Sequence, residues 1–432
     1  MNKPEIMAPA GSFAALTAAI EAGCDSVYFG VQQLNMRARS SINFTLEDLR
    51  EIAEICKKAG VRTYVTLNTL LYDHDLPLMR KIMDAAKEAG IDCIIVQDVA
   101  AIQYAQEIGM PIHASTQLSI SNYESVKFYA QYSDTIVLAR EVDLPSIAEI
   151  CKRIKEEKLK GPSGELVKIE CFVHGALCVA QSGRCQMSLL QTNTSAQRGA
   201  CLHECRKEYS LKEYTATDTE NGEELRIRQG YIMSPKDLCA LPFLDKLVDA
   251  GISVFKIEGR GRSPQYVDTV VKVYREATDA ITGDAPGEFT KEKVEDWMKR
   301  VSSVYNRGFC EGYYLGKKLP DWCETSGNVS TDERIFVGEV SHYFPKAKVA
   351  ELKVTAHEIR KGDRLVIMGK TTGVVYTAVD EMMDTNEDPK KEKLIDASGK
   401  PAIVTVKLDE RVRANDKIYI LKNRKSTSET NK

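Results

Sequence analysis

The sequence lacks the short motifs that mark several large classes of enzyme. It has no Gly-x-Ser-x-Gly nucleophile elbow, no phosphate-binding loop and no His-Glu-x-x-His zinc motif. The segment after the first apolar run, residues 9–12, reads Pro-Ala-Gly-Ser and is not the glycine-rich turn of a dinucleotide-binding fold. The chemistry of this chain must therefore be sought in other residues.

Long apolar runs and a strong net charge are also missing. No run approaches the roughly 18 apolar residues of a membrane-spanning helix, and residues 1–7 lack the apolar stretch of a signal peptide. We therefore expect a cytoplasmic protein with no membrane partner. The formal net charge of -3 gives no overall signature of nucleic-acid binding. Residues 333–432 nevertheless hold 20 Lys+Arg against 16 Asp+Glu, a surplus that a polyanion can use locally.

Cysteine is abundant, with twelve in the chain. In a reducing compartment such cysteines are metal ligands, redox groups or buried thiols. Four of them, Cys178, Cys185, Cys201 and Cys205, fall within 28 residues and are separated by six, fifteen and three residues. Structural zinc sites prefer two Cys-x-x-Cys-like pairs, whereas these unequal gaps suit a [4Fe–4S] cluster wrapped by a loop. Zinc and ordinary buried thiols remain alternatives, and Cys239 is a possible replacement for one ligand.

The first 280 residues repeat one unit, a short apolar run followed by an amphipathic stretch. Eight such units predict a (β/α)8 TIM-like barrel over residues 1–284. An open doubly wound sheet is the alternative, although it usually has fewer strands. The eight apolar runs are Glu5–Pro9, Ser26–Gly30, Thr63–Asn68, Cys93–Asp98, Pro111–Gln117, Thr135–Arg140, Lys168–His174 and Val254–Arg260.

The other parts of the chain have different patterns. Residues 175–234 form a cysteine-rich, metal-binding insertion, which a barrel would place at the C-terminal face where active sites are built. Residues 285–333 read as a helical connector. Short β-like runs over 334–423 predict a small antiparallel β-barrel, and the polar tail, 424–432, is predicted to be disordered.

Polar residues alternate along three of the predicted strands. Because alternate side chains of a barrel strand face the axis, these residues predict a buried polar network beneath the cysteines. Structural ion pairing, such as Lys256 with Glu170 or Glu258, is the alternative reading. The candidate catalytic residues are His113, Gln117, Glu170, His174 and Lys256.

Arginines follow several predicted strands on the same face. Arg37, Arg140 and Arg260, with Arg39 and Arg262 beside them, are placed where a ligand would bind. The guanidinium fork matches two oxygens of a carboxylate or phosphate. We therefore expect an anionic substrate or cosubstrate, such as a small dicarboxylate, to bind Arg37, Arg140 and Arg260.

These residues resemble the signature of peptidase family U-32, the collagenase-like family. The segment Glu170-x-Phe-Val-His-Gly-Ala-Leu-Cys178, followed by Cys185-x-Met-Ser188, carries most of the resemblance. Together with the supporting matches, it spans nearly the whole predicted barrel. Those matches are Met7–Gly11, Asp25–Gly30, Ile112–Gln117, Arg198–Arg206 and Phe255–Ser263.

The resemblance implies an enzyme. Some members of the family are described as collagenases, and others are hydroxylases that carry a [4Fe–4S] cluster on four cysteines. One cysteine module, a connector and a terminal β-barrel resemble the tRNA hydroxylase branch, which forms 5-hydroxyuridine at the wobble position of tRNA and depends on prephenate. By this resemblance the ligands are Cys178, Cys185, Cys201 and Cys205, the partner is tRNA and the cosubstrate is prephenate. A peptidase, and a hydroxylase of ribosomal RNA or of another aromatic substrate, are the alternatives.

Overall fold

The computed structural model describes residues 3–209, 215–217, 224–226, 233–283, 288–316, 321–323, 325, 327–384, 390–397 and 401–424. The tail predicted to be disordered lies outside these residues except for Arg424, whose backbone N–H donates to the carbonyl of Thr331. Most of the second half of the predicted insertion lies outside them as well. No helix of the described part is long and apolar enough to cross a bilayer.

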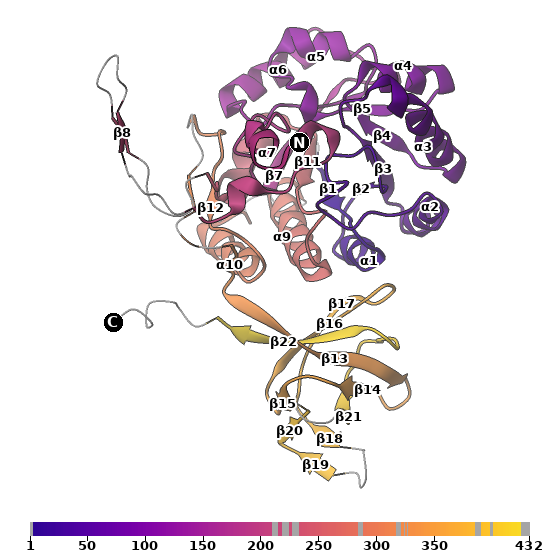
Figure 1. The fold of residues 1–432 in the computed structure, drawn as a ribbon, viewed down its shortest axis with the longest axis vertical. Coiled ribbons are helices and arrows are strands. Elements are labelled where there is room, and N and C mark those ends of the chain that lie inside the picture. Colours follow the sequence, from indigo (N-terminus) through magenta and orange to yellow (C-terminus); the bar gives the residue numbers. More distant parts are fainter. Residues whose placement is uncertain are drawn as a thin grey trace.

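The first part of the chain is a closed barrel of eight parallel strands, as the repeat predicted (Figure 1). Each strand pairs with its neighbour along the barrel, and β11 closes it by pairing with both β1 and β7. Short strands such as β1 and β2 are buried along their whole length, as parallel strands covered on both faces require. The barrel strands are β1 (Glu5–Pro9), β2 (Ser26–Gly30), β3 (Arg62–Leu67), β4 (Cys93–Val96), β5 (Ile112–Ala114), β6 (Thr135–Val137), β7 (Lys168–Ala176) and β11 (Val254–Ile257).

Helices cover the outside of the barrel. Side-chain caps begin several of them, such as Ser12 before α1 and Ser263 before α9. Left-handed glycines end α2 and α3, at Gly60 and Gly90. The helices are α1 (Phe13–Glu21), α2 (Asp48–Ala59), α3 (Leu76–Ala89), α4 (Val99–Ile108), α5 (Tyr123–Tyr129), α6 (Leu144–Glu156), α8 (Leu244–Asp249) and α9 (Pro264–Thr282).

Between β7 and α8 the chain makes the long excursion that carries the clustered cysteines. It contains α7 (Gln186–Thr192), β8 (Thr215–Thr217), β9 (Glu224–Arg226) and β10 (Asp237–Cys239). Strand β10 returns antiparallel to the end of β7. The connector contributes α10 (Lys291–Ser302) and β12 (Phe309–Cys310), and β12 pairs with β10. The connector is therefore not only helical, because it extends the sheet next to the insertion.

The C-terminal part is antiparallel, as predicted, and its strands form a sheet with a core of its own (Figure 1). Its strand order is β17-β16-β22-β13-β14-β21-β18-β19. The hairpin of β16 and β17 packs on α1 of the barrel, where Ala18 contacts Val366, Met368 and Val374. The strands are β13 (Asp332–Phe344), β14 (Val349–Val354), β15 (Glu358–Arg360), β16 (Arg364–Gly369), β17 (Gly373–Ala378), β18 (Met382–Asp384), β19 (Lys390–Glu392), β20 (Leu394–Asp396), β21 (Ala402–Lys407) and β22 (Lys417–Asn423).

Candidate active site at the mouth of the barrel

A cavity of about 410 Å³ lies at the C-terminal ends of the barrel strands. The loops after β2, β3, β5, β6, β7 and β11 line it, which is the position where barrel enzymes build their sites. The four clustered cysteines line this cavity, and so do Gln117, Lys256 and the arginines expected to bind an anion. The members of this group are Arg37, Gln117, Arg140, Cys178, Cys185, Cys201, Cys205, Lys256 and Arg260.

The four cysteines of the insertion differ from the other eight in exposure. Cys178, Cys185, Cys201 and Cys205 are partly exposed, whereas the eight remaining cysteines are buried. Burial raises the pKa of Cys205 to about 11, and the three neighbouring thiols add to the increase. Burial also raises the pKa of Cys201, and the neighbouring thiols of Cys178 and Cys185 add to the increase. The four sulfur atoms therefore interact as one group.

The donor chemistry of this group fits an iron–sulfur cluster, because four partly exposed cysteines face one cavity. Four thiolates around one shared cavity can hold a [4Fe–4S] cluster, which spaces its ligands more widely than zinc does. Cys239 does not join them, because it is buried against Tyr274 and its Sγ lies 3.6 Å from the Sδ of Met298.

Three guanidinium groups converge on one carboxylate in the cavity. Arg37 donates to Glu258 at 2.9 Å. Burial would raise the pKa of Glu258, but Arg37, Arg140 and Arg260 outweigh it and lower the pKa to about 2. Glu258 is therefore ionised, and it neutralises only part of the positive charge that faces a ligand.

The three arginines are committed to protein partners to different degrees. Arg260 is 5% exposed and its Nη1 donates to Asn35 at 3.0 Å and to Thr66 at 2.8 Å. Arg140 donates to the carbonyl of Ala176 at 2.6 Å, and its Cζ stands 3.8 Å from the centre of the Phe172 ring. The Nε of Arg140 is buried without a hydrogen-bond partner. Arg140 is thus the guanidinium with an unused donor, and a ligand oxygen can satisfy it.

An ion-paired triad lies at and below the floor of the cavity. Lys256 Nζ donates to Glu170 at 2.6 Å, and His113 Nδ1 lies 2.9 Å from the other carboxylate oxygen. Burial would raise the pKa of Glu170, but Lys256 and then His113 outweigh it and lower the pKa to about 2. Burial would lower the pKa of His113, but Cys93 and Glu170 outweigh it and raise the pKa to about 10. Of the three triad members, only Lys256 lines the cavity.

His174 lies elsewhere than the alternation of β7 predicted. The pairing of β7 with β11 shifts register at this point. Lys256 is opposite Phe172, but the next residue, Ile257, is opposite His174, so one residue of β7 is skipped. This bulge re-aims the side chain. His174 packs among Tyr266, Tyr274 and Phe309, and burial lowers its pKa to about 3. The expectation that His174 shares a face with Glu170 is therefore wrong.

Gln117 does face the cavity, and one of its atoms lacks a partner. Its side-chain oxygen is buried without a hydrogen bond, beneath Gly183 of the insertion. A Cβ at Gly183 would come within 2.6 Å of that oxygen. A glycine is needed here because the insertion lies directly on Gln117.

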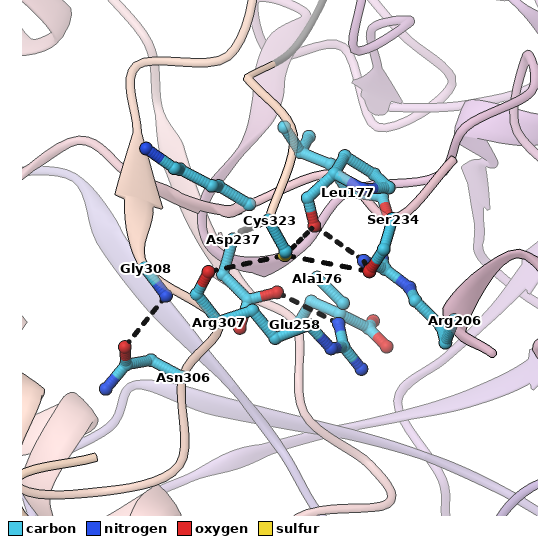
Figure 2. Close-up of polar contacts among 12 residues, drawn as sticks. Ala176, Leu177, Arg206, Ser234, Asp237, Glu258, Asn306, Arg307, Gly308 and Cys323 are labelled. Carbon is cyan, nitrogen blue, oxygen red and sulfur yellow. Dashed lines mark hydrogen bonds and ion pairs between the residues drawn. The ribbon is translucent and has the colours of Figure 1, made fainter. Parts of the chain in front are cut away.

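Other residues at the site were not among the candidates drawn from the sequence. Tyr305 of the connector lines the cavity and stacks with Arg262, whose Cζ is 3.6 Å from the ring centre. Arg206 and Arg307 also line it, and Figure 2 shows Arg206 reaching toward Ser234. Arg206 ends the motif Arg198–Arg206, but its contacts, like those of Arg307, join segments far apart in the chain, and neither periodicity nor motif spacing reveals such contacts.

Comparisons with known proteins agree on one family. Residues 11–324 match the model described as "Peptidase family U32". A protein named "Collagenase" from Porphyromonas gingivalis is 46% identical over 419 residues, which cover 97% of this chain and 98% of that protein. A protein named as a tRNA hydroxylation protein, from Bacillus subtilis, is 32% identical over 421 residues, covering 95% of this chain and 93% of its own length.

A third relative extends well beyond the matched part. The Escherichia coli protein named as a ribosomal-RNA 5-hydroxycytidine synthase is 36% identical over 324 residues. The match covers 73% of this chain but only 46% of that protein. The relatives' names thus divide between peptide cleavage and hydroxylation of RNA.

Proposed function

Because the chain belongs to peptidase family U32, we propose that it is an RNA hydroxylase that forms 5-hydroxyuridine at the wobble position of tRNA. The reaction depends on prephenate as cosubstrate, and Cys178, Cys185, Cys201 and Cys205 hold a [4Fe–4S] cluster. The observation that carries the proposal is that these cysteines and the arginines expected to bind an anion line one cavity at the barrel mouth. The relatives named for hydroxylation of tRNA and of ribosomal RNA support the reaction class.

The residues of the cavity have distinct tasks in this proposal. Arg140 binds a carboxylate of the cosubstrate through its unused Nε donor. Lys256 holds a proton on Nζ at the cavity floor, where Glu170 fixes its position. Gln117 offers an amide to the edge of a pyrimidine that has been flipped out of its stack. The cluster, when bound, supplies one-electron transfer.

Peptide cleavage is the second candidate, and the collagenase names favour it. It requires a nucleophile with a base, or a metal-bound water. Cys93 and His113 interact as a thiol–imidazole pair. However, Cys93 is 4% and His113 is 7% exposed, and neither lines the cavity. A peptide bond cannot reach this pair without opening the barrel.

The two candidates give different products. The test is to express the chain in a strain that lacks wobble 5-hydroxyuridine and to digest its tRNA to nucleosides for mass spectrometry. We expect 5-hydroxyuridine to appear with the wild-type chain and to be absent with Cys178→Ala. Nucleosides without this modification, together with cleavage of native collagen by the purified protein, would replace the proposal by the peptidase.

A further inference from the structure

Arg206 is placed between the two ends of the cysteine-bearing insertion. It ends a short 3₁₀ turn, Glu204–Arg206, directly after Cys205. Its Nη1 donates to the carbonyl of Pro235 at 2.6 Å and to the hydroxyl of Ser234 at 3.2 Å. Its Nη2 donates to the carbonyl of Leu177, the residue before Cys178. One side chain therefore ties together the beginning, the middle and the end of the insertion.

These three contacts require a fork of donors. One acceptor belongs to Leu177, 29 residues before Arg206. The others belong to Pro235, 29 residues after Arg206, and to the adjacent Ser234. A guanidinium presents several N–H groups in one fixed plane, whereas an ammonium is a point charge on a flexible stem. Arg206 can therefore hold both ends of the insertion at once, and a lysine at the same position cannot.

The anchor points of Arg206 are themselves held by the connector (Figure 2). The Ser234 hydroxyl donates to the Sγ of Cys323 at 3.6 Å, and this Sγ lies 3.4 Å from the carbonyl oxygens of both Pro235 and Arg307, which share its one S–H. Arg307 forms an ion pair with buried Asp237 at 3.1 Å. Since its acceptors are fixed in this way, Arg206 has a rigid target.

The charge of Arg206 also lies next to a ligand position. Arg206 directly follows Cys205 in the chain and lines the same cavity as the four cysteines, so its guanidinium is a fixed cation beside the proposed ligands. Electrons added to a cluster on Cys178, Cys185, Cys201 and Cys205 would be stabilised by a nearby fixed cation in a partly desolvated place. Removing that cation should make the cluster harder to reduce.

From these contacts we infer that Arg206 is a positioning residue of the metal centre, which presets Cys178 and Cys205 for the cluster and favours its reduced form. The inference rests on the proposed cluster. Partners that orient metal ligands typically change metal affinity by about 10–100-fold when they are removed.

The experiment compares anaerobically reconstituted wild-type chain with Arg206→Gln and Arg206→Lys. Arg184→Gln is the matched control, because Arg184 directly precedes Cys185 but is exposed. The measurements are iron per chain, the rate of iron release to a chelator, the midpoint reduction potential, and the circular dichroism of the metal-free protein.

We expect both Arg206 variants to release iron about 10–100-fold faster than the wild type. Only Arg206→Gln should also shift the midpoint potential to more negative values, because Arg206→Lys keeps the charge. Arg184→Gln should match the wild type in both respects. Equal release rates and potentials in the wild type and Arg206→Gln would overturn the inference, and so would an equal effect of Arg184→Gln. A wild-type chain that binds no iron would overturn the proposed cluster as well, so the two failures are distinguishable.

Discussion

At the residue scale, exposure separates the cysteines that face the cavity from those that belong to the core. Cys178 and Cys185 are partly exposed at the cavity, while Cys151 is on the buried face of α6. A thiol must reach the metal to ligate it, so only the exposed set is suited to this task. Replacing a cysteine should therefore affect metal binding only at the positions that face the cavity.

We predict that Cys178→Ala and Cys185→Ala abolish the cluster. The anaerobically prepared wild-type chain should be brown and contain about four irons, as one [4Fe–4S] cluster requires. The variants should be nearly colourless, and iron and sulfide analysis measures the loss. Cys151→Ala is the control and should keep its iron. A colourless wild-type chain that holds one zinc would contradict the prediction, and cluster loss in Cys239→Ala but not in Cys205→Ala would show that the ligand set is wrong.

We predict that Arg140→Ala weakens the binding of a small dicarboxylate. A charge-assisted hydrogen bond in a desolvated site contributes about 1.5–3 kcal/mol, so affinity should fall by roughly tenfold to more than a hundredfold. Calorimetric titration with prephenate measures this affinity in the wild type and the variant. Arg39→Ala is the control, because Arg39 is exposed and does not line the cavity. Unchanged binding in Arg140→Ala would remove Arg140 from the site.

Arg260→Ala should behave differently from Arg140→Ala. The sequence suggested equal roles, since each residue follows a barrel strand. In the structure Arg260 already donates to Asn35 and Thr66, so its removal takes one hydrogen bond from each of two buried groups. We therefore expect Arg260→Ala to lower the free energy of unfolding as well as the affinity, which urea denaturation would detect. A loss of affinity with unchanged stability would show that these hydrogen bonds do not support the fold.

We predict that His113 makes stability depend on pH. Its pKa is raised above 6.5 in the folded state, so its contribution is fully present below pH 6.5 and is lost as the pH rises toward about 10. Glu170 affects stability at low pH. Its contribution to stability is present above pH 4.5 and is lost as the pH falls toward about 2. His113→Gln should therefore destabilise the chain most near pH 6.5, and the difference should shrink toward pH 10.

Urea unfolding of the wild type and His113→Gln across this range measures the difference. His74→Gln is the control, because the side chain of His74 is 72% exposed. A destabilisation by His113→Gln that stays constant with pH would show that His113 is neutral in the folded protein at these pH values.

At the element scale, strand alternation predicted one polar face correctly and another only in part. Lys256, Glu258 and Arg260 all line the cavity, as expected for alternate residues of one strand. On β7 the same rule placed Glu170 correctly but misplaced His174, because a bulge adds one residue between them. Two-residue alternation alone cannot place such a bulge, although Gly175, directly after His174 in β7, is the kind of strand glycine that often accompanies one.

We predict that Gly175 keeps the end of β7 close to β11. Gly175 has φ +103, and a Cβ there would lie 2.4 Å from the carbonyl oxygen of Glu258. Gly164 has φ +83 but no atom within 4 Å of its would-be Cβ, so Gly164→Ala measures backbone strain alone. Gly175→Ala should destabilise the chain by about 1–3 kcal/mol more, the cost of overpacking. Chemical denaturation gives both values, and equal values would mean that the contact relaxes without cost.

At the scale of the whole molecule, the eight-unit repeat was sufficient to predict the barrel, because parallel barrel strands are continuous apolar runs separated by amphipathic helices. The antiparallel C-terminal sheet was also predictable from its short alternating runs. The pairing of β12 with β10, and the packing of β17 on α1, were not. Both depend on contacts between distant segments, which local patterns do not encode.

We predict that the segment from Glu333 onward contributes RNA affinity and not chemistry. It contains no cysteine and has a surplus of positive charge. Phosphate contacts release counterions, so binding that uses them weakens as salt rises. A chain truncated before Ile335 should keep its cluster but bind tRNA more weakly and with a smaller salt dependence in filter-binding titrations. Unchanged affinity and salt dependence would mean that the barrel loops alone hold the RNA.

The pairing of the connector with the insertion also imposes an order on biosynthesis. The cysteines leave the ribosome early, and β11 follows to close the barrel. Ser234 and Pro235, the anchors of Arg206, are contacted by Cys323 and Trp322 of the connector, which are made much later. A nascent chain that has a closed barrel therefore still has an unfinished cysteine pocket. If these cysteines hold the proposed cluster, its loading should follow the emergence of the connector.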